Sequence, residues 1–248
     1  MPDEVSPQPG ADTTRRASEI LSAELGAIHR RADRMFVVLM AVQWAAGIIA
    51  AAVISPATWV GTTESSHLHV WMSIVMGAVL LIAPALLVWR RPGAAVTRQT
   101  VAVAQMCWSA LLIHVTGGRI ETHFHIFGSL AFLAMYRDWR VLITATAVVF
   151  ADHILRGVWW PQSVFGTVVS SHWRWIEHGC WVVFEVIVLL IKVRQSVRDL
   201  EKGSSRLAQL GHSYARTEAE VERRTRELVD AKASADSANR AKSNFLAN

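Results

Sequence analysis

Six apolar segments separated by short polar loops fill the middle of this sequence. Most of them approach the roughly 20 residues that a helix needs to cross a bilayer, and the fourth is the shortest. Hydrophobic residues make up 52% of the chain, which is too apolar a composition for an ordinary soluble domain. We therefore predict an all-α membrane protein built on a six-transmembrane-helix bundle. The predicted spans are about 35–54, 68–89, 95–115, 122–136, 141–158 and 175–192.

Arginine and lysine indicate how the spans are oriented. They gather before the first span, in alternate loops, and after the last span, and cytoplasmic loops carry an excess of these residues. We therefore predict a multi-pass membrane protein with both termini in the cytoplasm. The net charge of the chain is +5. Because the basic residues lie beside apolar segments, we interpret them as a signal of membrane topology, and we expect no nucleic-acid partner. The clusters are Arg30, Arg31 and Arg34; Arg90, Arg91 and Arg98; Arg137 and Arg140; and Lys192, Arg194 and Arg198.

The composition changes after residue 192, where the chain becomes charged and typical of a long helix. An apolar residue recurs every seven positions there, which is a weak heptad pattern, and a solvated single helix is the alternative. We predict a parallel coiled coil that makes the protein a homodimer. The three predicted regions are a cytoplasmic N-terminal segment (1–34, disordered and then an amphipathic helix), the transmembrane sensor domain (35–192) and the cytoplasmic coiled-coil linker (193–248). The heptad residues are Leu200, Leu207, Tyr214, Val221, Leu228 and Ala235.

Two short motifs resemble parts of signalling proteins. The C-terminal stretch 237–248, SANRAKSNFLAN, resembles the start of the dimerisation and phosphotransfer domain of sensor histidine kinases. The stretch 122–140, THFHIFGSLAFLAMYRDWR, resembles an input module found ahead of kinases and chemotaxis transducers. The first resemblance implies the sensory input module of a two-component system, truncated before the phospho-acceptor histidine and without a catalytic domain of its own. It also implies kinase domains in the parent chain, a response regulator as a partner, and the bacterial inner membrane as the location.

Histidines concentrate in the predicted membrane region, where eight of the ten lie between residues 67 and 178. On the predicted topology they all lie near the outer ends of the spans. The three outer loops are too short for a folded sensor domain, so the signal must be sensed by the helices or by their outer ends. Ionisable residues inside spans are costly, and they usually pair with each other, mark a pathway or bind a metal.

The histidine pattern predicts one or two transition-metal ions, with iron, zinc or copper as candidates, because imidazole and carboxylate ligands suit these metals. The best-placed ligands are His69, His123, His125, His153 and His178, with Asp152, Glu177 and His114 in second rank.

Several alternatives stay open at this point. Asp152 and Arg156 are four residues apart on one helix, so a salt bridge alone explains this aspartate. His123 and His125 point about 200° apart on a regular helix, so they do not easily bind one ion. For the whole chain, the alternatives to a metal-binding sensor are a membrane metalloenzyme, a haem electron-transfer protein, and a metal-free sensor of pH or of a lipid signal.

Overall fold

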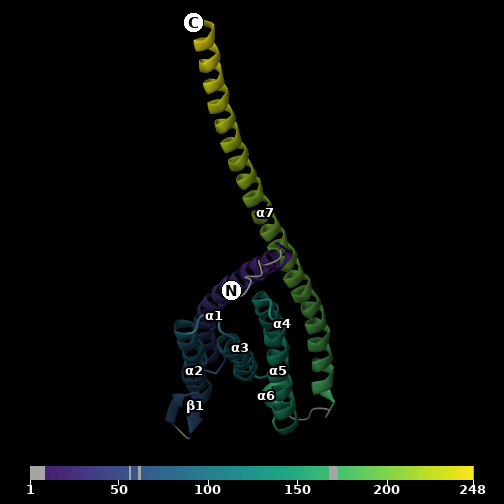
Figure 1. Ribbon diagram of the computed structural model, residues 1–248. Helices are drawn as coiled ribbons and strands as arrows, with labels where there is room; N and C mark the ends of the chain where they lie inside the picture. Colours follow the sequence, from purple (N-terminus) through teal and green to yellow (C-terminus); the bar gives the residue numbers. More distant parts are fainter. Residues whose placement is uncertain (1–8, 56, 61–62, 168–172, 248) are drawn as a thin grey trace, which may run out of the picture. The chain divides into compact units, whose positions relative to one another are not determined.

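The computed structural model describes residues 9–247 apart from 56, 61–62 and 168–172, and it is almost entirely helical (Figure 1). The prediction of an all-α chain with a long C-terminal helix is confirmed. Five predicted spans each lie in one α-helix, and the fourth, 122–136, ends in a 3-10 turn. A short antiparallel hairpin, which the sequence did not predict, pairs Ala57 with Ser66. The elements are α1 (Pro9–Ile54), β1 (Ala57–Val60), β2 (Thr63–Ser66), α2 (Leu68–Arg90), α3 (Ala95–Val115), α4 (Ile120–Leu133), the 3-10 turn η1 (Ala134–Tyr136), α5 (Trp139–Trp159), α6 (Pro161–Phe165) and α7 (Arg174–Ala247).

The chain divides into two compact units. The first is the helical bundle of residues 22–199, which contains the whole of α2 to α6. The second combines the N-terminal part of α1, up to residue 21, with α7 from residue 200 onward. Helices α1 and α7 each run through both units without a break in the described residues.

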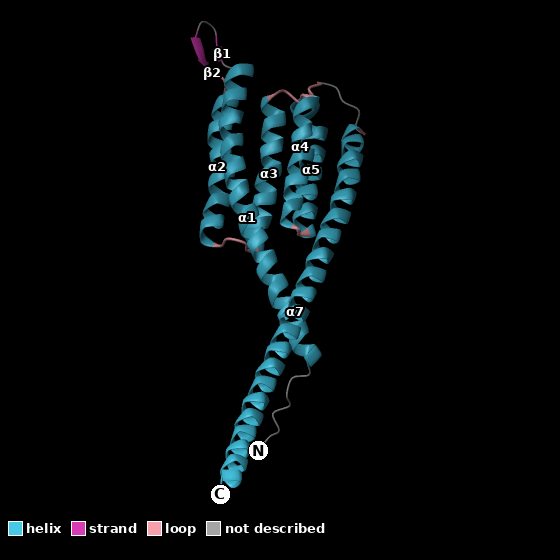
Figure 2. Ribbon diagram, turned by 90° about the horizontal axis from the view of Figure 1, so that it is seen from above, coloured by secondary structure: helices cyan, strands magenta, loops and turns pink. Residues whose placement is uncertain are grey.

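Helix α3 is the centre of the bundle, where it contacts α2, α4, α5 and α6 (Figure 2). Twelve of its residues are buried, among them Trp108 and Ile113, which are fully covered. Polar residues of α3 are also buried, including Gln105 and Ser109. The buried surface of α3 is therefore mainly apolar, and its buried polar residues face neighbouring helices.

Three described helices are long and apolar enough to cross a membrane: α1, α2 and α5. The predicted count of six spans is therefore not supported by length and composition. The other three predicted spans fall short for different reasons: α3 carries Arg98 and Gln99 in its first turns, α4 has 14 residues, and the apolar start of α7 contains Glu177, Glu185 and Lys192.

A buried polar network closes the end of the bundle that carries the arginines. Fully buried Asp33 accepts hydrogen bonds from the Tyr136 hydroxyl (2.8 Å) and from the backbone N–H of Gly93 (2.6 Å). Arg98 pairs with Asp138 (2.9 Å) and also donates to the carbonyl oxygen of Gly93 (2.7 Å). We call these five residues the Asp33 cluster. It joins α1, the α2–α3 turn, α3 and the α4–α5 turn, so it fixes how these elements meet.

The turn before α5 shows how local sequence supports this cluster. Arg137 adopts a left-handed conformation (φ 54°), which ends the 3-10 turn, and Asp138 then caps α5 by accepting from the N–H of Arg140. Asp138 therefore both begins a helix, as aspartate commonly does, and binds Arg98. The stretch MYRDWR thus fixes the geometry of the turn between two helices.

The second unit carries exposed heptad residues and surface ion pairs. Leu207, Tyr214, Val221 and Leu228 are each more than half exposed in the single chain. Glu220 binds Arg223 (2.7 Å) and Arg224 (3.1 Å), and these hydrogen bonds hold the pKa of its carboxyl below the ordinary value. The exposed apolar stripe is what a coiled-coil partner would cover, and the dimer stays a prediction.

Candidate functional site

Three histidines from three helices meet at the end of the bundle opposite the Asp33 cluster. Their ring centroids are 5.6 Å (His123 to His153), 5.2 Å (His123 to His178) and 6.0 Å (His153 to His178) apart. They belong to α4, α5 and α7, and we call them the histidine cluster. The ring of Phe165 from α6 lies beside two of them, 5.1 Å from His178 and 6.4 Å from His153.

All three rings are oriented by the same local contact. In each case Nδ1 lies beside the carbonyl oxygen four residues earlier: Arg119 for His123 (2.9 Å), Val149 for His153 (3.2 Å) and Arg174 for His178 (3.0 Å). A carbonyl oxygen only accepts, so Nδ1 must carry the proton and donate it. In a neutral ring, Nε2 then carries a lone pair, which can bind a metal or accept a hydrogen bond.

The Nε2 atoms of the histidine cluster have no hydrogen-bond partner within the part of the chain that the structure describes. That of His123 is fully buried and unpaired. Leaving a polar atom in this state costs free energy, and few native proteins do so without a reason. The cluster therefore combines three imidazoles that carry their proton on Nδ1 with at least one buried Nε2 lone pair that lacks a partner among the described residues.

A cavity of about 450 Å³ opens beside the cluster between α4, α5 and α7. Its walls are mostly apolar and aromatic. Glu177, which is exposed, supplies its carboxylate. The lining residues are Ile120, His123, Phe124, Ile126, Phe127, His153, Glu177, His178, Trp181 and Val182.

The geometry does not amount to an assembled metal site. Among the described residues, no group of three or more His, Cys, Asp or Glu side chains is arranged so that it could already hold a metal ion. The three rings would have to move toward a common point for their Nε2 atoms to share an ion.

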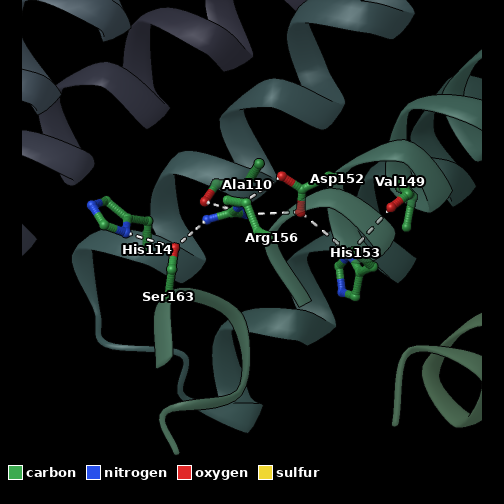
Figure 3. A network of polar contacts seen from close by, with 7 residues as sticks. All are labelled: Ala110, His114, Val149, Asp152, His153, Arg156 and Ser163. Carbon is green, nitrogen blue, oxygen red and sulfur yellow. Dashed lines mark hydrogen bonds and ion pairs between the residues drawn. The ribbon is translucent and has the colours of Figure 1, made fainter. Parts of the chain in front are cut away.

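Asp152, a second-rank predicted ligand, has a structural partner instead (Figure 3). Arg156 binds it through two hydrogen bonds of 2.7 Å each, which is the bidentate pairing that the spacing suggested as an alternative. Asp152 also lies 3.3 Å from Nδ1 of His153, so it orients that ring. Its role is therefore to support a histidine of the cluster.

Arg156 continues this network away from the cluster. It donates to Ser163 Oγ (2.8 Å) and to the carbonyl oxygen of Ala110 (3.1 Å), and Ser163 Oγ lies 2.8 Å from Nδ1 of His114 (Figure 3). Helix α6, which carries Ser163, is held near the α3–α4 turn because the backbone of Gly118 approaches that of Gly166. A Cβ at Gly118 would lie 2.2 Å from Gly166 N, so only glycine fits there.

Two predicted ligands form a separate group with a histidine that was not predicted as one. The ring of His69 lies 4.3 Å from that of His67 and 4.9 Å from that of His114. His67 caps α2 by accepting the N–H of His69 at Nδ1 (3.1 Å), so its Nε2 carries the proton in the neutral ring. This group therefore offers two free imidazole lone pairs at most, which is fewer than the histidine cluster.

His125, a first-rank predicted ligand, lies apart from both groups. Its Nε2 accepts from the amide of Gln43 (2.9 Å), and its Nδ1 lies 2.8 Å from Ser109 Oγ. Both ring nitrogens are occupied, so it joins α1, α3 and α4 as a structural residue. The 200° separation from His123 on a regular helix accounts for this divergence.

The sequence named Arg156 only as a salt-bridge partner of Asp152, and it did not identify Ser163 and Phe165 as residues of the site. The last two lie on α6, in a stretch read as an outer loop. Pro161 was the available signal, since proline at the first position of a helix is common and here begins α6.

Comparison with known proteins finds a similar transducer. The transducer protein Htr8 of Halobacterium salinarum is 27% identical over 136 residues, which is 54% of this chain. The aligned part is 20% of the transducer, so the chain matches about a fifth of the length of that curated relative. No family model matches the chain, and no solved structure matches it. The similarity supports a role in signal transduction, and the resemblance to sensor histidine kinases stays a prediction.

Proposed function

We propose that this chain is the membrane-embedded input module of a signalling protein and that the histidine cluster binds a transition-metal ion. The observation that carries the proposal is the shared tautomer: His123, His153 and His178 each donate Nδ1–H to a backbone carbonyl. Among the described residues no partner faces their Nε2 atoms, and that of His123 is buried. Metal-binding histidines in proteins typically donate the other ring N–H to such an acceptor.

Ring spacing supports a shared ion. With metal–nitrogen bonds of about 2.1 Å, imidazoles around a tetrahedral ion have centroids roughly 5 Å apart. The observed separations of 5.2, 5.6 and 6.0 Å need only small side-chain movements to reach this value. Three nitrogen ligands would leave room in a four-coordinate ion for Glu177, which lines the same cavity, or for an external ligand. The donor set suits zinc, iron or copper.

The proposed relay uses α7. His178 lies in the second turn of this helix, which then continues without interruption to Ala247. A metal that draws His178 toward α4 and α5 therefore acts directly on the helix that leads to the C-terminus. We further propose that α7 pairs in a homodimer through its heptad residues and that it precedes kinase domains of the parent protein.

We also propose that all six apolar segments cross the bacterial inner membrane, with both termini in the cytoplasm. Burial of α3 supports this, because its polar residues face other helices and not lipid. Reporter fusions test it: a fusion at residue 94 should report a cytoplasmic position, and one at 118 an outer position. An outer report at residue 94 would contradict the topology.

Metal counting on the purified full chain tests the site. His123→Ala, His153→Ala and His178→Ala should each lose most of the bound metal, as measured by elemental mass spectrometry. His125→Gln is the matched control on the same helix as His123, and His212→Ala is an exposed control on α7; both should keep the metal. A wild-type protein that is purified without chelator, carries no stoichiometric transition metal and gains none on titration would rule the proposal out.

The same sample distinguishes the alternatives. An intense Soret band would identify haem in place of a bare ion, and turnover of a lipid substrate would favour a membrane enzyme. A metal-free protein whose output follows pH would favour a sensor that uses the imidazoles as titratable groups.

A further inference from the structure

A second cleft lies at the opposite end of the bundle, between α1 and α2. This cleft is open to the surface and has a volume of about 600 Å³. It is lined by Arg30, Arg34, Val37, Val38, Ala85, Val88, Trp89 and Pro92. All these residues belong to the bundle unit. Helices α1 and α2 are two of the three helices that are long and apolar enough to span a membrane, and they lie side by side (Figure 2).

The cleft is basic at one end and apolar along the rest. On α1, Arg30, Arg34 and Val38 are spaced four apart, so they lie on one face of the helix in order from charged to apolar. Helix α2 is antiparallel to α1, so the direction from the charged to the apolar end of the cleft runs from Trp89 back to Ala85 on α2. The order of side chains therefore matches an amphiphile whose charged group lies at the end of the helices and whose hydrocarbon chain lies along them.

Both arginines of the cleft are exposed. The structure gives neither Arg30 nor Arg34 an ion pair or a hydrogen-bond acceptor among the described side chains. The neighbouring carboxylate, Asp33, is fully buried and already occupied by Tyr136 and Gly93. The side chain of Arg30 also lies close to the turn between α2 and α3. A Cβ added at Gly93 would be 3.1 Å from Cγ of Arg30.

We propose that this cleft binds an anionic phospholipid, with the phosphate between Arg30 and Arg34 and an acyl chain against Val38, Ala85 and Val88. Basic pockets between membrane helices recognise anionic head groups, and tryptophan at the membrane interface favours the same depth as the head group. The exposed ring of Trp89 lies at this level of the cleft. The site is independent of the histidine cluster and of any metal.

Lipid binding to the purified full chain in detergent tests the proposal. Native mass spectrometry should show phosphatidylglycerol retained in preference to phosphatidylcholine. Arg30→Gln combined with Arg34→Gln should weaken retention about 25-fold, at about fivefold for each arginine. The matched control combines Arg194→Gln and Arg198→Gln, which remove the same charge from exposed sites on α7 and should change retention less than about twofold.

Two further measurements separate a lipid site from a simple anion site. Ala85→Phe keeps both arginines but fills the apolar part of the cleft, so it should weaken phosphatidylglycerol retention as strongly as the double arginine variant. Phosphatidylglycerol brominated on its acyl chains should quench tryptophan fluorescence in the wild type, and Trp89→Phe should remove that part of the quenching. Both results hold even if the arginine variant fails to fold.

The proposal is wrong if inorganic phosphate binds the wild type and Ala85→Phe equally and displaces the lipid, because the site would then take a free anion. It is also wrong if the control on α7 weakens retention as much as the arginine variant in the cleft. In that case overall charge, and not the cleft, would attract the lipid.

Discussion

The bundle contains two polar clusters at opposite ends, and they differ in how completely their groups are paired. In the Asp33 cluster, each carboxylate oxygen of Asp33 accepts a hydrogen bond, and Arg98 donates to both Asp138 and a backbone carbonyl. In the histidine cluster, each ring places Nδ1 beside a carbonyl oxygen of its own helix, and the buried Nε2 of His123 has no partner in the part of the chain that the structure describes. Both clusters are largely buried, so burial alone does not distinguish them.

The contrast separates a structural role from a binding role. A buried network whose groups are all paired connects elements and resists change, because breaking any contact leaves a polar group unsatisfied. A buried group with an unused lone pair costs free energy until a ligand satisfies it. The Asp33 cluster should therefore determine stability, and the histidine cluster should determine response to a ligand.

The largest expected effect is on stability at the Asp33 cluster. Asp33→Ala removes the acceptor of two buried donors, the Tyr136 hydroxyl and the Gly93 N–H, and should lower the free energy of unfolding by about 3 kcal/mol. Denaturant or thermal unfolding in detergent, followed by circular dichroism, measures the change. The exposed Asp230→Ala is the control and should lie within about 0.5 kcal/mol of the wild type.

Metal should stabilise the protein only through the histidine cluster. At a free ion concentration of 100 times the dissociation constant, binding to the native state alone adds about 2.7 kcal/mol. The same titration should leave the unfolding of His123→Ala unchanged, whereas His125→Gln should respond as the wild type does. Equal stabilisation of all three proteins would show that the ion binds elsewhere.

A single hydrogen bond of the Asp33 cluster should have a smaller effect. Tyr136→Phe keeps the ring stacked on Phe36 but removes a donor to a carboxylate, which should cost about 2 kcal/mol. Tyr214→Phe is the matched control, because Tyr214 is the other tyrosine and is exposed on α7. No difference between the two variants would mean that the Asp33 cluster is not a structural lock.

The smallest effect should come from the histidine cluster without its ligand. In chelator-treated protein, His178→Ala removes a half-buried ring that is hydrogen-bonded to its own helix and lies beside Phe165, so the free energy of unfolding should change by about 1 kcal/mol or less. With metal present, the difference in the free energy of unfolding between this variant and the wild type should grow to the stabilisation by metal, about 2.7 kcal/mol. A large loss in the chelated protein would instead make His178 a structural residue.

The sequence by itself determined where the helices lie. Five predicted spans each lie in one α-helix because long apolar runs are a local property of the chain, and α7 followed from the change in composition after residue 192. Placing the histidines by topology also brought most of them to one end, including the three that form the histidine cluster.

Only the tertiary structure decided which of those histidines meet. The positions of residues along the sequence do not show which way each helix turns its side chains. They also do not show how the helices pack against one another. Packing separated His125 from His123, paired Asp152 with Arg156, and joined His69 to His67 and His114. It also enclosed α3, a helix that is not apolar enough to span by composition, because neighbouring helices cover its polar residues. Hydrogen bonding to carbonyls one turn earlier then determined which nitrogen of each ring carries the proton.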